Sequence, residues 1–324
     1  MKTTGFYLEL FENALRGESF ISDPLKLYEP IQYTLSLGGK RLRPVLCLLG
    51  CDLYGGSCEK AMPAAIAVEI FHNFTLVHDD IMDNSPIRRG QPTVFKKWNT
   101  NIAILSGDVM FAKAYEYVAR LDTPDLKPIL NVFTDTAIKV CEGQQYDMDY
   151  EVFSNVGIDD YLNMIILKTA VLTGASLKIG ALMAGASTEQ SDLLYTFGLN
   201  LGIVFQLQDD LLDVFSDETK FGKKTGSDIL AGKKTYLFLK SIELMPPGER
   251  EEFYVYYTSS ENNADEKIAY VKSVYEQLNI RHHVIQLMHI YHNESLKILE
   301  KCTGTPEVII QLKELAETML VREI

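Results

Sequence analysis

The chain has 324 residues, of which 47% are hydrophobic and 23% charged, as expected of a globular protein with a large core. Its formal net charge of −13 excludes nucleic acid as an expected partner, because the phosphate backbone would be repelled. An anionic substrate would have to meet a local cluster of cations or a metal ion.

Targeting and redox features are weak in this sequence. The five cysteines lack a CxxC pair, so we expect them to be small buried hydrophobes in a reducing compartment. Glu9 and Glu12 interrupt the only apolar stretch near the N-terminus, which therefore does not resemble a signal peptide. Since no uninterrupted apolar run reaches about 18 residues, we expect a cytoplasmic protein without stable membrane insertion.

Helical periodicity runs through most of the chain. Apolar residues recur at three- and four-residue spacing in long segments, whereas alternating strand-like runs are nearly absent. The periodic segments are 61–83, 101–120, 126–146, 160–184, 191–213, 234–244 and 264–300. Glycines and prolines separate these segments, but none of the breaks is a long linker. We predict an all-α fold in a single large domain that spans residues 1–324.

The first segment whose residues could bind a ligand is GGKRLRP at residues 38–44. It is a predicted loop that begins with two glycines and carries three cations just before an apolar helix. Glycine lets a backbone approach an anion closely, and guanidinium groups bind phosphate oxygens bidentately. Taken alone, the segment is equally consistent with a solvated basic turn.

Next along the chain, HDDIMD at residues 78–83 ends a predicted apolar helix. On a helical wheel Asp79 and Asp83 differ by about 40°, whereas Asp80 lies about 100° from Asp79. The two carboxylates on one face repel each other and meet the negative end of the helix dipole. A hard divalent cation removes that penalty, and Mg²⁺ typically takes one or two carboxylates together with substrate phosphate oxygens.

The pattern recurs at residues 209–213, DDLLD, again near the end of an apolar helix. Asp209 and Asp213 share one face, and Gln206 lies about 60° from Asp209. A single such pair arises easily by chance or as a solvated helix end. Two copies on otherwise apolar helices favour a metal site.

Cations follow each carboxylate cluster. Arg88 and Arg89 come soon after the first, while Lys223-Lys224 and Lys233-Lys234 follow the second in a Gly-punctuated loop that also holds Asp228. This alternation of acidic and basic groups suits a polyanion that is bridged to the protein by metal.

Together these segments resemble the trans-prenyltransferases, the short-chain isoprenyl diphosphate synthases. The segments that carry the resemblance are GGKRLRP at 38–44, HNFTLVHDDIMDNSPIRRGQPT at 72–93, LKT at 167–169, FQLQDDLLD at 205–213 and FGKKTGSDI with GKKTY across 221–236. The resemblance implies the helical isoprenoid synthase fold around a central cavity, a homodimer and three Mg²⁺ ions. It also implies the reaction: an allylic diphosphate (dimethylallyl, geranyl or farnesyl) ionises, isopentenyl diphosphate attacks the cation, and diphosphate is released.

The resemblance further implies a role for each matching residue. Expected metal ligands are Asp79, Asp83, Asp209 and Asp213. The allylic diphosphate would be held by Arg88, Lys168 and Lys233. Isopentenyl diphosphate would be bound by Lys40, Arg43, His72 and Arg89. The carbocation path would be lined by Thr169 and Gln206, with Lys223 assisting the diphosphate. The wheel independently places His72 about 20° from Asp79, although a core histidine is the alternative.

Product length is expected to depend on the helix that carries Asp79. In the resembling family a bulky side chain five residues before the first aspartate limits the tunnel, and here that residue is Phe74. Thr75 is small and the aspartate motif has no insertion, so a C20 product is favoured over C15. The wheel puts Thr75 and Phe71 within about 80° of Asp79 but Phe74 about 140° away, so ordinary core packing is the alternative for Phe74.

Other functions compete with this interpretation. A class I terpene cyclase shares the first motif but ordinarily has a different second motif and no need of Lys40 and Arg43. An HD-type phosphohydrolase is indicated only by the His78-Asp79 dyad, and a non-catalytic subunit would be expected to lose its aspartates. His289 and His292 have metal-compatible spacing, but a solvated helix face is the favoured interpretation. The C-terminal LVREI lacks the basic tail with which some members of the resembling family close the site.

Overall fold

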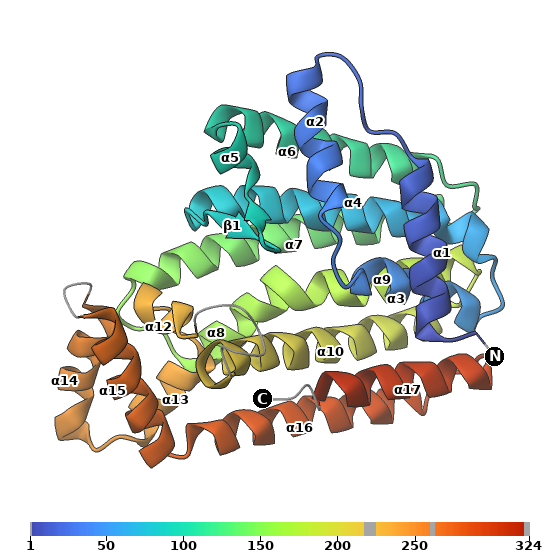
Figure 1. Cartoon of the computed structure of the whole chain (residues 1–324). Coiled ribbons are helices and arrows are strands. Elements are labelled where there is room, and N and C mark those ends of the chain that lie inside the picture. The colour runs from blue at the N-terminus through green and yellow to red at the C-terminus, as the bar shows by residue number, and fades with distance from the viewer. Residues whose placement is uncertain (1, 217–224, 260–262, 321–324) are drawn as a thin grey trace. The chain divides into compact units, whose positions relative to one another are not determined.

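The computed structural model describes residues 2–216, 225–259 and 263–320, and nearly all of its regular structure is helical (Figure 1). Across these ranges the only strands are β1 (Ile87–Arg88) and β2 (Gln91–Pro92), which pair antiparallel in a short hairpin. The all-α prediction is confirmed.

The chain divides into two compact units that are interleaved in sequence. Unit 1 comprises Met1–Thr134, Ala175–Tyr195 and Cys302–Gln311, and unit 2 comprises Asp135–Gly174, Thr196–Lys301 and Leu312–Ile324. The single domain over residues 1–324 stays a prediction.

Unit 1 is built on its first six helices and the hairpin. These helices are α1 (Thr4–Gly17), α2 (Leu25–Ser36), α3 (Leu42–Leu53), α4 (Cys58–Met82), α5 (Val94–Lys97) and α6 (Thr100–Ala119). Helix α4 packs along α6 and α3, and it is buried over most of its length. Close approach is possible because α6 carries Gly107, where an added Cβ would lie 2.2 Å from His78 Nε2.

Unit 2 has its own aromatic core. Its helices are α8 (Ile158–Ile165), the π-helix η1 (Ile166–Ala170), α12 (Ser227–Ala231), α13 (Tyr236–Leu244), α14 (Pro247–Thr258), α15 (Ala264–Gln277) and α16 (Ile280–Leu299). Phe238 of α13 stacks on Tyr257 of α14 with ring centroids 4.1 Å apart, and both side chains are buried. Helices that contribute residues to both units are α7 (Leu126–Val152), α9 (Val171–Met183), α10 (Thr188–Phe215) and α17 (Pro306–Leu320).

The predicted helical segments correspond to observed helices, with one error. Residues 264–300 do not form one helix, because the chain breaks into α15 and α16 at Asn279, whose φ of 53° is left-handed. Asparagine tolerates this conformation, and a single such residue ends a helix without disturbing the apolar pattern on either side.

Two further observations concern the cysteines and the most apolar helical stretch. Four cysteines are buried as predicted, but Cys141 is exposed, so the prediction is wrong for that residue. Within the described part of the chain, one stretch, Ile158–Met183, is long and apolar enough to cross a membrane. However, 78% of its most apolar window is buried inside the protein, as in the core helix of a globular protein.

Candidate functional site

The first aspartate cluster lies at the end of α4 in unit 1. The backbone N–H of Asp83 donates to the carbonyl of Asp79 over 2.8 Å, so the helical turn is intact up to the capping residue Asp83. The two residues are therefore one turn apart on one side of the helix, as the wheel predicts. Asp79 is half-buried and Asp83 is exposed. Paired carboxylates at a helix C-terminus offer the hard oxygen donors that Mg²⁺ prefers.

The middle aspartate of this cluster has a different task. Asp80 is 3% exposed; its Oδ1 accepts a hydrogen bond from Nε of Arg88 at 2.8 Å and forms an ion pair with Nη2 of Arg88 at 2.8 Å. Burial raises the pKa of Asp80 to about 6, although Arg88 opposes that shift. Arg88 on β1 is thus oriented by a carboxylate that the sequence reasoning did not assign. The only indication in the sequence of this role was the helical-wheel angle of about 100° between Asp80 and Asp79, which places Asp80 on a different face.

Two predicted ligands of isopentenyl diphosphate meet in unit 1. Nη1 of Arg43, at the start of α3, lies 3.2 Å from Nε2 of His72 on α4. Burial, followed by the charges of Arg43, Arg89 and Arg88, holds the pKa of His72 well below its usual value. The neutral imidazole can therefore accept a hydrogen bond from Arg43, which fixes the direction of that guanidinium.

Arg89 lies against the glycines of the basic loop. Its Nη1 donates to the carbonyl of Gly38, and a Cβ at Gly39 would lie only 2.9 Å from the Arg89 guanidinium carbon. Gly39 also has a φ of +136°, which other residues rarely adopt. In this structure the glycines therefore admit the side chain of Arg89. The loop cations Lys40 and Arg43 flank Arg41, whose guanidinium is buried among protein acceptors.

Unit 2 contains a pocket of its own. Four predicted residues, Lys168, Thr169, Gln206 and Lys233, all line it. Other lining residues are Asp147, Tyr161, Met164, Ile165, Asp210 and Asp228. The structure thus brings together residues that are separated by up to about one fifth of the chain, as the resemblance implies.

A π-helical turn presents Lys168 and Thr169. These residues lie in η1, which interrupts the long helix between α8 and α9. Glycines face both sides of this turn. A Cβ at Gly143 would lie 2.2 Å from the backbone N of Lys168, and one at Gly202 would lie 2.5 Å from Cα of Ala170. Single π-turns are rare and frequently occur at functional sites.

Hydrogen bonds connect this turn to the second aspartate cluster. The hydroxyl of Thr169 donates to Oε1 of Gln206 over 3.0 Å, and Nε2 of Gln206 donates to Oδ1 of Asp210 over 2.8 Å. The hydroxyl of Tyr161 donates to Oδ2 of Asp210. Burial, together with the charge of Asp228, raises the pKa of Asp210 to about 8.

Lysines near the pocket have distinct partners. Nζ of Lys168 forms an ion pair with Asp147 at 2.5 Å. Nζ of the buried Lys234 donates to the carbonyls of Tyr150 and Glu151 at 2.6 and 3.0 Å, and so fixes the backbone beside Lys233 to the end of α7. Sequence reasoning gave Lys234 no role, because a lysine pair does not reveal which member turns inward.

The last aspartate of the second cluster caps a neighbouring helix. The carboxylate of Asp213 accepts hydrogen bonds from the hydroxyl of Ser227 and, over 3.0 Å, from the backbone N–H of Asp228 in the first turn of α12. Asp209, the first aspartate of this cluster, is half-buried on α10. The predicted residue Lys223 lies outside the described residues, as does nearly all of the C-terminal LVREI.

The predicted chain-length residues belong to an aromatic cluster in unit 1. The ring of Phe74 lies 5.5 Å from that of Phe71 and 5.2 Å from that of Phe111, and Phe71 also contacts Phe133 at 5.5 Å. The hydroxyl of Thr75 donates to the carbonyl of His72 over 2.8 Å. Phe74 therefore lies on the same side of α4 as Phe71. Its role as the tunnel stop stays a prediction.

The remaining histidines do not support a histidine-based site. His78 packs on Phe74 and Gly107, and its Nε2 lies 3.2 Å from the carbonyl of Ile104. Among the residues that the structure describes, no three His, Cys, Asp or Glu side chains already form a metal site. The expected solvated face is wrong for His292, which is only 7% exposed, whereas His289 is exposed.

The chain is similar to known proteins over most of its length. The sequence pattern of the family described as polyprenyl synthetase matches residues 24–278. The chain is 37% identical over 305 residues to a geranylgeranyl diphosphate synthase of Methanosarcina mazei, covering 94% of this chain and 92% of that protein. It resembles a crystal structure of geranylgeranyl pyrophosphate synthase with a TM-score of 0.94 and 42% identity over the whole of both chains.

A second solved structure includes a cation and a diphosphate. A polyprenyl synthase from Caulobacter crescentus CB15, complexed with calcium and isoprenyl diphosphate, is 27% identical. Its TM-score is 0.89, with 100% of this chain and 99% of that chain covered.

Proposed function

Because this chain belongs to the polyprenyl synthetase family, we propose that it is a trans-prenyltransferase that joins an allylic diphosphate to isopentenyl diphosphate and releases diphosphate. Dimethylallyl, geranyl or farnesyl diphosphate serves as the primer, and the C20 product is favoured over C15. The observation that carries the proposal is the pair of aspartates one turn apart at the end of α4, with Arg88, Arg43 and His72 in the same unit. The names of the Methanosarcina mazei protein and of the first structure above support the C20 product.

The two substrates are assigned to different cations. Isopentenyl diphosphate is bound by Lys40, Arg43, His72 and Arg89, an assignment that is supported by the contact of Arg43 with His72. The allylic diphosphate is bound by Arg88, Lys168 and Lys233. Support comes from the carboxylates that orient two of these cations, Asp80 for Arg88 and Asp147 for Lys168.

Prenyl diphosphate synthases of this family generally depend on Mg²⁺, and we assign three ions here to Asp79, Asp83, Asp209 and Asp213. The donor set fits, because all four side chains offer hard oxygen ligands that Mg²⁺ prefers. When bound, Mg²⁺ neutralises the negative charge that develops on the departing diphosphate. Asp213 would make this contribution while its carboxylate also caps α12.

The protein's own groups perform the rest of the chemistry. Fixed lysines and arginines stabilise charge on the leaving diphosphate more strongly than in the bound substrate, which lowers the barrier. Thr169 holds the amide of Gln206, so its dipole is already oriented near the developing cation. Met164 and Ile165 line the same pocket and exclude water, which would otherwise capture that cation. The final proton goes to the released diphosphate.

Product growth is assigned to the side of α4 that carries Phe71 and Phe74, with Thr75 as the small neighbour. The contacts of both phenylalanines with Phe111 support this assignment, because bulky rings would stop a growing chain. A homodimer in the cytoplasm completes the proposal.

The proposal is tested by incubating the protein with labelled isopentenyl diphosphate, Mg²⁺ and each primer in turn, then sizing the products. We expect incorporation of label into a C20 diphosphate. A terpene cyclase would instead convert a prenyl diphosphate to a hydrocarbon or alcohol without consuming label. A phosphohydrolase would release phosphate from the substrates without lengthening any chain.

A further inference from the structure

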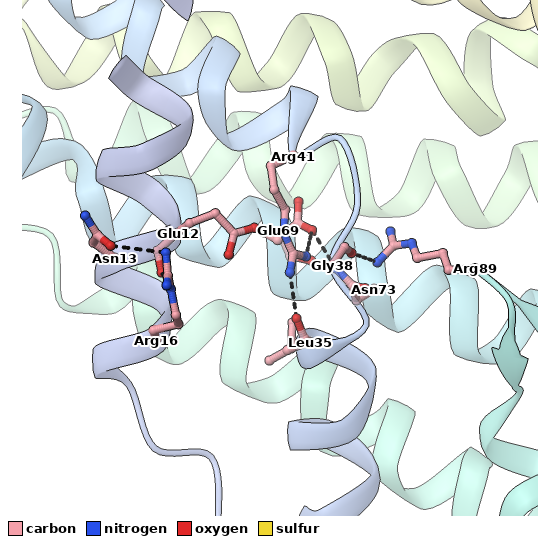
Figure 2. Close-up of polar contacts among 9 residues, drawn as sticks. All are labelled: Glu12, Asn13, Arg16, Leu35, Gly38, Arg41, Glu69, Asn73 and Arg89. Carbon is pink, nitrogen blue, oxygen red and sulfur yellow. Dashed lines mark hydrogen bonds and ion pairs between the residues drawn. The ribbon is translucent and has the colours of Figure 1, made fainter. Parts of the chain in front are cut away.

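The basic loop at residues 38–44 carries one cation that the proposed function leaves without a role. Arg41 lies between Lys40 and Arg43, but its side chain is only 2% exposed. Each end of its guanidinium meets a protein acceptor: Nε donates to Glu12 at 2.8 Å, and Nη1 donates to Glu69 at 2.6 Å. Nη2 donates to the carbonyl of Leu35 at 2.6 Å. Figure 2 shows Arg41 enclosed by these three acceptors.

These acceptors tie Arg41 to three helices of unit 1. Glu12 belongs to α1, Leu35 to the last turn of α2 and Glu69 to the middle of α4. Arginine suits this position, because its planar group donates in fixed directions that a lysine ammonium cannot reproduce. The residue that begins α3 is thereby held against the neighbouring helices.

The backbone at Arg41 is strained in a way that needs such support. Its φ of 47° and ψ of 33° are left-handed, a conformation that is uncommon for residues other than glycine and asparagine. Strained backbone persists where the surrounding contacts determine it, and it is concentrated at binding sites. Here the strained residue separates the two cations that are assigned to isopentenyl diphosphate.

Glu69 is the buried partner of this arrangement. It is 1% exposed, and its Oε1 accepts hydrogen bonds from Arg41 and from Nδ2 of Asn73, the latter at 2.9 Å. A buried carboxylate requires such pairing. Because Glu69 lies one turn before His72 and Asn73 on α4, it links the basic loop to the helix that carries His72 and Asp79.

The loop is also held from its other side by Arg89. The Nη1 of Arg89 donates to the carbonyl of Gly38 (Figure 2). The Arg89 guanidinium also fills the space where a side chain on Gly39 would lie. Arg89 itself has a left-handed φ of 52°. Arg41 and Arg89, both with left-handed backbones, therefore hold the segment from Gly38 to Lys40 from two sides.

We propose that Arg41 is a positioning residue which, through Glu69 and Glu12, fixes the loop so that Lys40 and Arg43 meet a diphosphate. Arg41 is not itself a diphosphate ligand, because its three donor nitrogens are all committed to protein acceptors. The identity of that diphosphate as isopentenyl diphosphate rests on the proposed function.

The first test uses a substitution pair that avoids leaving a buried charge unpaired. Arg41→Met alone would leave Glu69 uncompensated and could unfold the protein, so the double variant Arg41→Met/Glu69→Gln is compared with Glu69→Gln alone. We expect both to raise the KM for isopentenyl diphosphate at least about tenfold. The KM for the allylic substrate should stay within about twofold, since that substrate uses other cations.

Three further variants separate positioning from general stability. Arg41→Gly, made together with Glu69→Gln, keeps the left-handed backbone but removes the guanidinium, and Arg41→Lys keeps the charge but not the three-way contact. Both should show the raised KM. Tyr7→Phe is the control, because it removes the hydrogen bond from α1 to Asp52 and weakens the same helix as Glu12 without touching the loop. It should lower the melting temperature and leave both KM values unchanged.

Hydrogen exchange supplies a readout that needs no substrate. The amides of residues 38–43 should exchange faster in Glu69→Gln and in the double variant, whereas those of α6 should be unchanged. Isothermal titration with inorganic diphosphate in excess chelator, where only the cations of the protein bind it, should show weaker binding in the same variants. If wild-type protein consumes no isopentenyl diphosphate, the proposed function fails, while exchange and diphosphate binding still decide the role of Arg41.

The proposal is overturned by any of three results. Glu69→Gln could have wild-type KM values and diphosphate binding while Arg41→Gly/Glu69→Gln loses both, which would make Arg41 a direct ligand. The variants could impair both substrates equally in proportion to their loss of stability. Exchange at residues 38–43 could match that of the wild type.

Discussion

The two aspartate clusters have the same spacing but are constructed differently. In the first, the middle residue Asp80 is paired with the cation Arg88, and its pKa is raised by burial to about 6. In the second, the middle residue Asp210 accepts hydrogen bonds from the neutral groups of Tyr161 and Gln206, and burial raises its pKa to about 8. One motif is therefore supported by an ion pair and the other by a chain of neutral donors.

The last residues of the two clusters differ as well. Asp83 caps α4 and is exposed, whereas Asp213 lies within α10 and caps the short helix α12. The position five residues before the first aspartate is Phe74 in α4, within an aromatic cluster, but the buried Val204 in α10. What the clusters share is the helical spacing of their outer carboxylates, so the proposed metal binding depends on this spacing.

The largest expected effect comes from the shared feature. Asp79→Asn and Asp209→Asn should each lower kcat at least about 1,000-fold, equivalent to about 4 kcal/mol, because each removes a charged metal ligand. Circular dichroism should show intact helices, and the exposed Asp122→Asn is the control. Near-normal turnover in either variant would mean that only one cluster holds metal.

A smaller effect is expected from the cations near the two clusters, which we assign to different substrates. Arg43→Ala should raise the KM for isopentenyl diphosphate about 10- to 100-fold, while Lys233→Ala should act mainly through the allylic substrate. Steady-state kinetics with one substrate varied at a time measure both. Equal impairment of both variants toward both substrates would contradict the division of roles.

The aromatic surroundings of the first cluster predict a change in product with little change in rate. Phe74→Ala should shift the products from C20 toward C25 and longer, with Phe71 as a second stop, because the removed ring leaves room for a longer chain. Chromatographic sizing of the diphosphates measures the shift, and Val204→Ala is the matched control on α10. An active Phe74→Ala variant with the wild-type product spectrum would show that Phe74 is core packing only.

The smallest effect concerns His72, whose pKa is lowered by burial and by the charges of Arg43, Arg89 and Arg88. The fold holds the pKa of His72 well below its unfolded value of about 6.5. As the pH falls, the unfolded chain therefore takes up a proton at His72, whereas the folded chain does not. Stability should therefore be lost below about pH 6.5, by about 1 kcal/mol at pH 5.5. Urea denaturation should show this loss in wild type and in His289→Gln but not in His72→Gln. An equal loss of stability at low pH in His72→Gln would show that other titrating groups cause it.

Sequence patterns predicted the helices and the spacing of the outer aspartates because both follow from local periodicity. They also predicted the side of α4 on which His72 lies, and His72 contacts Arg43 in the structure. Periodicity gives the face of a helix on which a residue lies, and the proposed roles of these residues depend on that face.

What the sequence could not predict depends on partners that are distant in the chain. Arg41 was grouped with the loop cations, but Glu12, 29 residues earlier, and Glu69, 28 residues later, turn it inward. Asp80 and Asp210 are equivalent by position, and only their neighbours distinguish them. The break at Asn279 depends on one backbone angle that leaves the apolar pattern unchanged.

The central claim is that both aspartate clusters hold a diphosphate through Mg²⁺, and calorimetric titration with inorganic diphosphate tests it without catalysis. We expect the wild-type protein to bind diphosphate in Mg²⁺ and to lose the Mg²⁺-dependent part of that binding in excess chelator. Both Asp79→Asn and Asp209→Asn should weaken the Mg²⁺-dependent binding at least about tenfold. Unchanged diphosphate affinity in chelator, or in either aspartate variant with its helices intact, would contradict the claim.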